Sequence, residues 1–472
     1  MSIFYLFPFF ISLTHQAFIC PSQPITIDQA KSGSIPSSSS SLQVIQANYT
    51  CDYQFVIPVG YAISFTFSTN YNYEKEEISF VDNLNRPYRL GTPMSNYPHW
   101  AVQPSAHVLI RTVTNTSKVL VLYQYVDISK FNHVNYDTGN VLSLSSFQPQ
   151  TFYTFNSKLN DSIVLQLSKS VDNLRAASSN YYIFDGSDIT ASKMIGRLSE
   201  YLVTACNSTG SSISLVNFYS TRMNDFVIAN DKTIINVYTT YTFAVVANNP
   251  SYPQHDTSST SGYSANTIYC VDCESLYLES IQFYAHGLVQ LLPKTPTTIG
   301  GPLITYDSDD FQNSTQLPQI IPSKIFTVLS TQNYIVTRVG VSPDQWLTPS
   351  DGRKGYIFAP NSWMAQTQSF SYYFKSSNDY KYSIVFGTHD FDNSTNLEIN
   401  IGRDSGVVLS KVINQQAFNF NDFSAVGSYM NVTYTGDNKS YLSMRYKMDF
   451  VSGGSKCLGV LSILVTVMMY LN

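Results

Sequence analysis

The sequence predicts an all-β protein built from tandem antiparallel β-sandwich modules. β-Branched and aromatic residues alternate with polar ones in short runs, and Asn, Gly, Pro and Asp interrupt these runs. Sustained helical periodicity is absent between the two hydrophobic ends of the chain. A sheet made of such strands buries one face, so it needs a second sheet to cover that face.

The predicted strands recur along the chain at a spacing of about 100 residues, which is typical of repeated modules. The clearest strands cover residues 61–67, 118–126, 162–167, 180–186, 212–219, 382–387 and 397–402. Strand pairs with one common form, an apolar alternation, a polar gap and a strand ending in Asp or Gly, cover residues 61–82, 162–186, 278–307 and 382–404. This rhythm predicts four modules.

Two stretches predict boundaries between modules. Residues 248–267 contain no Leu, Ile, Val, Met or Phe and therefore predict a linker, and Pro and Gly cluster again at 342–360. The predicted division is a signal peptide at 1–19, modules at 20–126 and 127–247, a linker at 248–267, modules at 268–345 and 346–451, and an anchor signal at 452–472. The alternative is that both stretches are long hairpin loops inside larger sandwiches.

The N-terminal end predicts secretion. Residues 3–13 form a short apolar run, and Ala17 and Cys20 follow it within a few residues. This order is typical of a secretory signal peptide. The chain is therefore expected to enter the secretory pathway and to fold in an oxidising compartment.

The C-terminal end predicts a lipid anchor. Small residues occupy positions 452–455, and an apolar tail runs from Leu458 to Leu471. As a helix this tail would extend about 21 Å, less than a bilayer core of about 30 Å. The pattern is typical of a glycosylphosphatidylinositol (GPI) signal, with attachment at Ser452 or Gly453 on the extracellular face of the plasma membrane. The alternative is a short helix that anchors the tail in the membrane.

Charge is sparse in this chain. Asp, Glu, Lys and Arg make up 12% of the residues, the net charge is −5 and no block of like charges occurs. This composition excludes nucleic acid as a partner. Eight N-x-S/T sequons occur, about as many as chance predicts, and each is a candidate N-glycosylation site in a secreted chain. Their asparagines are Asn48, Asn115, Asn160, Asn207, Asn313, Asn393, Asn431 and Asn438.

Six cysteines are too few for a disulfide scaffold. Cys20 and Cys51 enclose a polar, Ser-rich loop, and we expect them to form a disulfide. Cys270 and Cys273 have the spacing of a redox motif but lack the strand and helix that such a motif needs. Two alternatives remain open for them: a local bridge, or a bridge from one of them to Cys206.

From Cys51 to Phe67 the sequence CDYQFVIPVGYAISFTF resembles the opening of a CUB domain. That family has a cysteine, alternating aromatic and aliphatic positions, a Pro-x-Gly turn and then an alternating apolar strand. The alternation predicts that Phe65 is buried in the core. With Cys20 included, residues 20–126 resemble the nematode CUB-like family, whose members are secreted or membrane-tethered. The resemblance implies a jelly-roll type sandwich, a Cys20–Cys51 bridge, and a host-defence role at an epithelial surface.

A second and fainter resemblance covers the next module. Residues 181–186 (YYIFDG) and 195–198 (IGRL) are similar to a central CUB strand, its Asp-Gly turn and the Gly-Arg that follows. Residues 127–247 are therefore expected to be a second CUB-like domain. Some CUB domains bind calcium through carboxylates, but Asn180 and Ser220 stand where acidic ligands would be expected here. We predict no metal and no cofactor.

The sequence contains no motif that is typical of a catalytic site. Histidines are scattered singly, and no metalloprotease, serine-hydrolase or phosphate-loop motif occurs. We therefore expect a binding protein and not an enzyme, with an extracellular protein or a glycan as its ligand; a lectin-like protein and a structural coat protein are the alternatives. Aromatic residues in polar contexts are the candidate ligand contacts: Tyr71, Tyr73, Tyr97, Trp100, Tyr372 and Tyr373.

Overall fold

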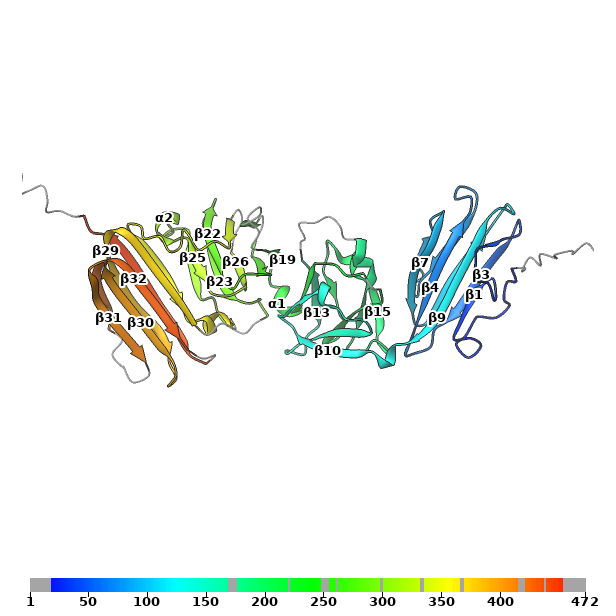
Figure 1. Ribbon diagram of the computed structural model, residues 1–472, viewed down its shortest axis with the longest axis horizontal. Helices are drawn as coiled ribbons and strands as arrows, with labels where there is room; N and C mark the ends of the chain where they lie inside the picture. The colour runs from blue at the N-terminus through cyan, green and yellow to red at the C-terminus, as the bar shows by residue number, and fades with distance from the viewer. Residues whose placement is uncertain are drawn as a thin grey trace, which may run out of the picture.

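The computed structural model describes residues 18–168, 176–219, 221–247, 254–259, 262–297, 300–331, 335–365, 369–414, 421–436 and 439–452. These residues form four β domains that follow one another in a row (Figure 1). Nearly all strand pairs are antiparallel, which confirms the predicted fold class. Residues 1–17 of the predicted signal peptide, and Gly453 with the apolar tail, lie outside the described residues.

The first domain is a sandwich of two sheets. One sheet has the order β1 (Ser32–Ile35), β9 (Lys118–Asp127), β4 (Tyr61–Asn70) and β7 (Met94–Val102), with β2 (Gln43–Val44) also paired to β9. The other has the order β3 (Thr50–Val56), β8 (Ser105–Arg111), β5 (Glu77–Val81) and β6 (Pro87–Arg89). Phe65 has 0% of its surface exposed, and its ring lies 5.0 Å from that of Phe55 on the opposite sheet. The predicted burial of Phe65 is confirmed.

The second domain is also a sandwich. Its first sheet has the order β10 (Asn132–Asp137), β12 (Thr151–Asn156), β17 (Ser212–Asn217), β14 (Tyr181–Asp185) and β15 (Lys193–Arg197), with β10 and β12 parallel. Its second sheet has the order β11 (Val141–Ser143), β18 (Phe226–Asp231), β13 (Ile163–Leu167) and β16 (Cys206–Asn207). The apolar faces of both sheets meet in one core.

The third domain repeats this arrangement. Its sheets have the orders β19 (Thr240–Val246), β21 (Ser264–Cys270), β26 (Ile325–Ser330), β23 (Leu288–Pro293), β24 (Ile304–Asp307), and β20 (Gln254–Ser259), β27 (Ile335–Gly340), β22 (Leu276–Phe283), β25 (Gln319–Ile321). The structure differs here from the predicted linker at 248–267, because β20 and the start of β21 lie within that segment. Polar residues at the start of β21 are accommodated because their side chains bond within the fold, as the buried pair Thr267 and Thr327 does at 2.8 Å.

The fourth domain is built on one six-stranded sheet. Its order is β28 (Arg353–Phe358), β33 (Tyr441–Phe450), β29 (Ser369–Asp390), β32 (Phe423–Thr435), β30 (Asn396–Arg403) and β31 (Gly406–Asn414). Alternation along these strands buries one side of the sheet. Trp346, from the segment before β28, is fully buried in this core, with its ring 4.8 Å from that of Phe374.

Helices are short and connect the strands. They are α1 (Lys232–Ile235), α2 (Asn313–Gln316) and the 3₁₀ turns η1 (Ile128–Lys130), η2 (Leu144–Ser146), η3 (Ala176–Asn180), η4 (Leu198–Tyr201) and η5 (Pro360–Trp363). Among the described residues, no helix has the length and apolar character needed to cross a membrane.

Side chains connect the successive domains. Between the second and third domains, the Asn230 amide donates to the Tyr241 hydroxyl at 2.9 Å. Between the third and fourth, Gln319 is fully buried, donates to the Tyr356 carbonyl at 2.8 Å and accepts from its N–H at 2.9 Å. Trp363 follows β28 but packs into the core of the third domain. These contacts make the row of domains continuous.

Candidate binding site

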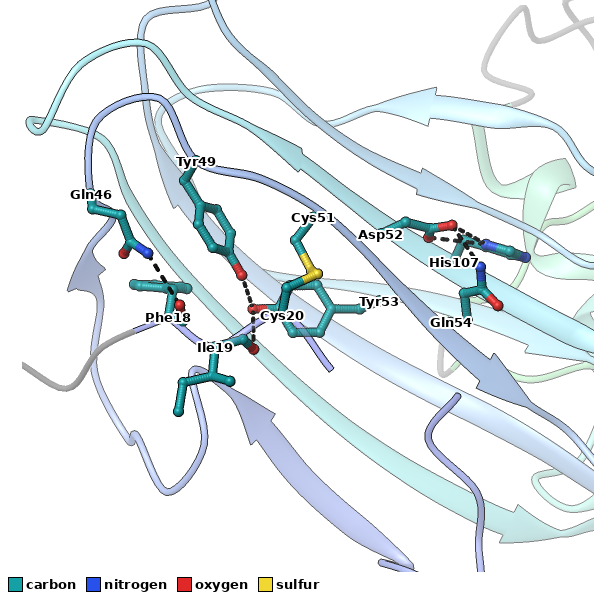
Figure 2. The surroundings of a disulfide bond; sticks show 10 residues. All are labelled: Phe18, Ile19, Cys20, Gln46, Tyr49, Cys51, Asp52, Tyr53, Gln54 and His107. Atoms are coloured by element: carbon teal, nitrogen blue, oxygen red, sulfur yellow. Dashed lines mark hydrogen bonds and ion pairs between the residues drawn. A yellow bond between two sulfur atoms is a disulfide. The ribbon is translucent and has the colours of Figure 1, made fainter. Parts of the chain in front are cut away.

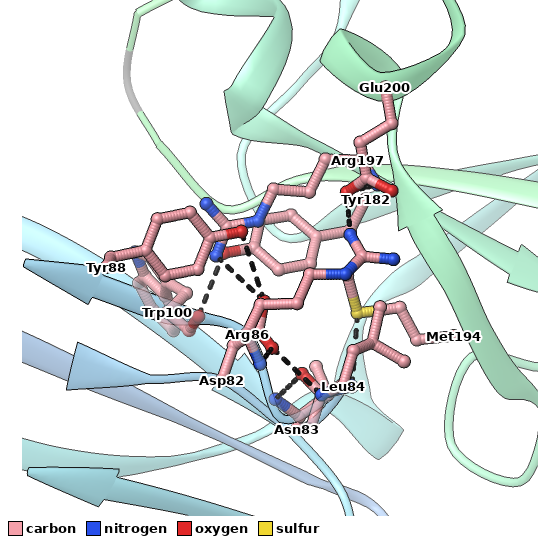
Figure 3. A network of polar contacts seen from close by, with 11 residues as sticks. Asp82, Asn83, Leu84, Arg86, Tyr88, Trp100, Tyr182, Met194, Arg197 and Glu200 are labelled. Atoms are coloured by element: carbon pink, nitrogen blue, oxygen red, sulfur yellow. Dashed lines mark hydrogen bonds and ion pairs between the residues drawn. The ribbon is translucent and has the colours of Figure 1, made fainter.

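Arg197 lies at the centre of the junction between the first two domains (Figure 3). The guanidinium carbon is 4.8 Å from the ring centroid of Tyr88 and 4.9 Å from that of Tyr182, so the cation lies between rings of both domains. Its Nη2 is 3.8 Å from the buried carboxylate of Asp82. Arg86 of the first domain also pairs with Glu200 of the second.

Apolar contacts close the same junction. The Trp100 ring stacks on that of Phe218 at 5.0 Å, and the Tyr182 hydroxyl donates to the Trp100 carbonyl at 2.9 Å. The buried cluster between the domains consists of Ala62, Val102, Ile128, Phe152, Tyr182, Phe184, Ile189, Met194 and Val216. Trp100, predicted as a ligand contact, therefore has a structural partner in the neighbouring domain.

His99 is buried beside this junction. Burial, helped by the positive charge of Arg197, lowers the pKa of His99 to about 4. Its imidazole is therefore neutral at physiological pH and packs against the rings of Phe80 and Phe67.

A polar groove lies on the outer face of the first domain, over strands β1, β9 and β4. Ser32 and Ser64 both pair with Gln124, from opposite sides of β9. One row further along, Ser34 and Thr66 flank Leu122 in the same way. Because alternate residues of a strand share one face, these six side chains form the floor of the groove.

The groove has a volume of about 690 Å³ and carries no charged side chain. Its lining consists of Ala30, Ser32, Gly33, Ser34, Ser37, Ser38, Ser39, Ser64, Thr66, Leu122, Tyr123 and Gln124. Gly33 is required beneath it, because a Cβ atom there would lie 2.5 Å from the Tyr123 hydroxyl. The side chains of Ser32, Thr66 and Gln124 form no hydrogen bond within the described residues, so their donors and acceptors are available to a ligand.

The loops at the end of the first domain distant from the second are organised by Glu76. Its carboxylate accepts five hydrogen bonds, from the N–H groups of Asn72, Val113 and Thr114 and the hydroxyls of Thr114 and Ser117. Burial disfavours the charged carboxylate, but these donors outweigh it and lower the pKa of Glu76 to about 2. Glu76 therefore acts as an acceptor for loop donors and has no free face for a cation.

The N-terminal segment is fastened to β3 (Figure 2). Cys20 and Cys51 form a disulfide, which confirms the predicted pair. Around it, the Gln46 amide donates to the Phe18 carbonyl at 3.1 Å, and the hydroxyls of Tyr49 and Tyr53 lie 2.7 Å apart. This polar segment is thus held by one covalent and several polar contacts.

The other cysteines follow one of the two alternatives that the sequence left open. Cys270 and Cys273 form a local bridge, and Cys206 is a buried thiol. Burial raises the pKa of Cys206 to about 12, so the thiol is protonated and unreactive at physiological pH.

The predicted ligand aromatics do not meet at one site. Tyr71 is 7% exposed and lies 6.0 Å from Tyr73, which is 46% exposed and carries Arg89 over its ring at 3.9 Å. Tyr97 is 52% exposed on β7. In the fourth domain, Tyr372 is half-buried against Phe370 and Trp346, and Tyr373 is exposed on the opposite face of β29.

The predicted glycosylation sites lie mostly at the surface. Asn48, Asn115, Asn160, Asn207, Asn313 and Asn393 are exposed, and Asn431 is half-buried. Asn438 lies outside the described residues. The Asn313 amide donates to the Ile281 carbonyl at 2.7 Å and accepts from its N–H at 3.0 Å, so this side chain already takes part in the fold.

No group of three or more His, Cys, Asp or Glu is arranged to hold a metal ion in the part of the chain that the structure describes. The carboxylates of the acidic turn at 307–310 contact other groups of the protein. Asp309 pairs with His286 at 2.7 Å, and the Asp307 carboxylate accepts a hydrogen bond from the Asp309 N–H at 3.0 Å. Asn180, at a position of a missing acidic ligand, donates to the Thr221 hydroxyl at 3.0 Å.

Residues 15–129 match the family model described as the CUB-like domain. The first domain of this chain is therefore a CUB-like domain, as its sequence predicts. CUB-like domains are typically extracellular binding modules, and the match indicates an extracellular binding role for this domain. The family match ends where the second domain begins, so a second CUB-like domain at 127–247 stays a prediction.

The comparison with solved structures finds proteins that contain CUB domains and jelly rolls. The CUB1-EGF-CUB2 region of human MASP-1/3 has 9% identity and a TM-score of 0.19, with 42% of this chain and 98% of that chain covered. The corresponding region of rat MASP-1 has 9% identity and a TM-score of 0.18, with 67% and 99% covered. A triple jelly roll protein of an archaeal virus has 8% identity and a TM-score of 0.18, with 86% and 83% covered. These TM-scores support no argument about function, and none of the curated proteins matches this chain.

Proposed function

We propose that this chain is a non-enzymatic cell-surface protein, held by a GPI anchor at Ser452 or Gly453, that binds a neutral carbohydrate with its CUB-like domain. The observation that carries the proposal is the uncharged, hydroxyl-lined groove over β1, β9 and β4. Resemblance to the nematode family adds a host-defence role at an epithelial surface.

The chemistry of the groove matches that of a sugar. Each sugar hydroxyl both donates and accepts a hydrogen bond, and so do the hydroxyls of Ser32 and Thr66 and the amide of Gln124. Leu122, which is 39% exposed, offers an apolar surface for the C–H face of the ring between these polar groups. A neutral lining provides no ion pair for a charged ligand, so we expect neutral glycans to be preferred.

A protein ligand is the second candidate. Tyr73 is exposed and lies against the guanidinium of Arg89, and aromatic and Arg side chains often dominate the binding energy of protein interfaces. Tyr73→Ala would weaken the binding of a protein ligand at this position, whereas it would leave the binding of a glycan in the groove unchanged.

Binding of the secreted chain to an array of neutral glycans tests the proposal. Thr66→Val and Gln124→Leu keep the size of two groove side chains but remove their hydrogen bonds, so together they should weaken binding about tenfold or more. Thr305→Val and Gln282→Leu, at exposed positions of the third domain, form the matched control. Wild-type affinity in the groove variant, or no bound neutral glycan, contradicts the carbohydrate proposal; self-association without any ligand favours a structural coat protein.

A further inference from the structure

The outer face of the fourth domain carries a sequon in the middle of its sheet. Strands β29, β32 and β30 lie side by side there (Figure 1). In the register of the sheet, Asn431 on β32 lies directly opposite Tyr373 on β29. Thr433, which completes the sequon, lies on the same face, since alternate residues of a strand share one face. The residues between them, Met430 and Val432, are fully buried in the core, so the face with Asn431 points to solvent.

The Asn431 amide is free on the atom to which a glycan would be attached. The Ser371 hydroxyl donates to Asn431 Oδ1 at 3.3 Å, whereas Nδ2 forms no hydrogen bond to any residue that the structure describes. A sugar on Nδ2 therefore leaves the existing hydrogen bond intact. The Asn313 amide differs, because its Nδ2 and Oδ1 both bond to the backbone of Ile281.

Two tyrosine rings lie beside Asn431 on this face. Tyr429 precedes it by two residues on the same strand, and the ring of Tyr429 is 5.5 Å from that of Tyr373. A Cβ atom at Gly402, opposite Tyr429 on β30, would collide with the Tyr429 hydroxyl, so this side chain lies across the neighbouring strand. Tyr373 is 45% exposed. Rings placed in this way offer an apolar surface and a polar hydroxyl to a sugar.

We propose that Asn431 carries an N-linked glycan and that its first N-acetylglucosamine packs on the rings of Tyr373 and Tyr429. The sugar then covers the middle of the outer face and is part of the folded fourth domain. In the attachment step, Nδ2 forms a bond to C1 of the sugar, and the bond from C1 to the diphosphate of a lipid-linked oligosaccharide donor breaks. The lipid diphosphate leaves and the amide loses one proton. The proposal rests on the secretion that the proposed function requires, but not on the ligand or the anchor.

Secretion of the full chain from cultured animal cells tests the attachment. An amidase that releases N-glycans converts each glycosylated Asn to Asp, and peptide mass spectrometry should then find Asp at position 431. Thr433→Ala removes the sequon, whereas Thr433→Ser keeps it, so the two variants form a matched pair. Because the sugar contacts the rings only in the folded sheet, amide hydrogen exchange along β32 should be about fivefold faster in Thr433→Ala than in Thr433→Ser.

A double-mutant cycle tests whether the rings hold the sugar. Tyr373→Thr removes one ring and keeps a residue that favours strands. It should speed exchange along β32 about fivefold more in the Thr433→Ser background than in the Thr433→Ala background, which lacks the glycan. Tyr284→Thr is the control, because Tyr284 is 61% exposed in the third domain, and it should change exchange along β32 in neither background.

An unmodified Asn431 in a secreted chain whose other sequons are glycosylated overturns the proposal. Equal effects of Tyr373→Thr in both backgrounds also overturn it, because the ring would then make no contact with the sugar. A chain that binds no neutral glycan on the array, yet shows the expected difference between the two backgrounds, rejects the proposed ligand alone and supports the glycan at Asn431.

Discussion

We predict that the Glu76 carboxylate stabilises the loops at the end of the CUB-like domain distant from the second domain, and Glu76→Gln tests this. The ordinary pKa of a glutamate carboxyl is 4.5, whereas the hydrogen-bond donors around Glu76 lower its pKa in the folded protein to about 2. A difference of about 2.5 pKa units corresponds to about 3 kcal/mol. Because the pKa is lower in the folded state, this stabilisation is present above pH 4.5 and is lost as the pH falls to about 2.

Glutamine keeps the shape but removes the charge. Its NH₂ group is a hydrogen-bond donor that faces other donors, at the position where a carboxylate oxygen accepts hydrogen bonds. We expect Glu76→Gln to lower the free energy of opening of these loops by about 3 kcal/mol at pH 7, and by only about 1.4 kcal/mol at pH 3, where the unfolded wild-type carboxyl is already neutral. Amide hydrogen exchange of the intact protein reports this directly. Exchange at Val113 and Thr114 should be about 100-fold faster at pH 7.

Glu74→Gln is the matched control, because Glu74 is exposed two residues away and its side chain bonds to nothing within the described residues. This variant should exchange like the wild type. If Glu76→Gln leaves the protection of Val113 and Thr114 unchanged, or changes it equally at pH 7 and pH 3, the carboxylate does not hold these loops.

Three further predictions concern the first domain and its junction with the second. Phe65→Ala should cost about 3 to 5 kcal/mol, because it empties a fully buried ring site between the sheets, and a thermal melt that matches the wild type would show this packing to be wrong. Cys51→Ser should prevent secretion of the folded domain, since it removes the covalent link between Cys20 and β3, and loss of a native disulfide typically costs about 2 to 5 kcal/mol; normal secretion with a native melt contradicts this. Arg197→Met should loosen the junction with the second domain, seen as faster proteolysis between residues 127 and 135, while Arg222→Met, at an exposed position, should not.

The sequence predicts those strands whose buried face is defined by the alternation of apolar and polar residues within the strand itself. Phe65 could be placed in the core because alternation over 61–67 and a Pro-Gly turn before it define which face is buried. The Cys20–Cys51 pair could be predicted because its loop is polar and lies near the chain start. These features need no knowledge of distant partners.

Features that depend on distant partners could not be read in this way. The start of strand β21 could not be predicted from the sequence, because Ser264, Asn266 and Thr267 are polar yet buried. Only the neighbouring strands provide their partners. Trp100 lies in a polar local context, but Phe218 of the second domain covers it. The groove requires β1 to pair with β9 in one register, and the short sequence SGSI does not specify that pairing.

The GPI-anchored location proposed for this chain requires that lipid replaces the C-terminal tail. Treatment of cells that express the full chain with a phosphatidylinositol-specific phospholipase C tests this claim most directly. The account predicts that the enzyme releases the protein and that the released chain ends at Ser452 or Gly453 by mass spectrometry. Retention on the cells of a chain that still carries Leu458 to Asn472 would contradict it, and a short tail helix would take the place of the lipid.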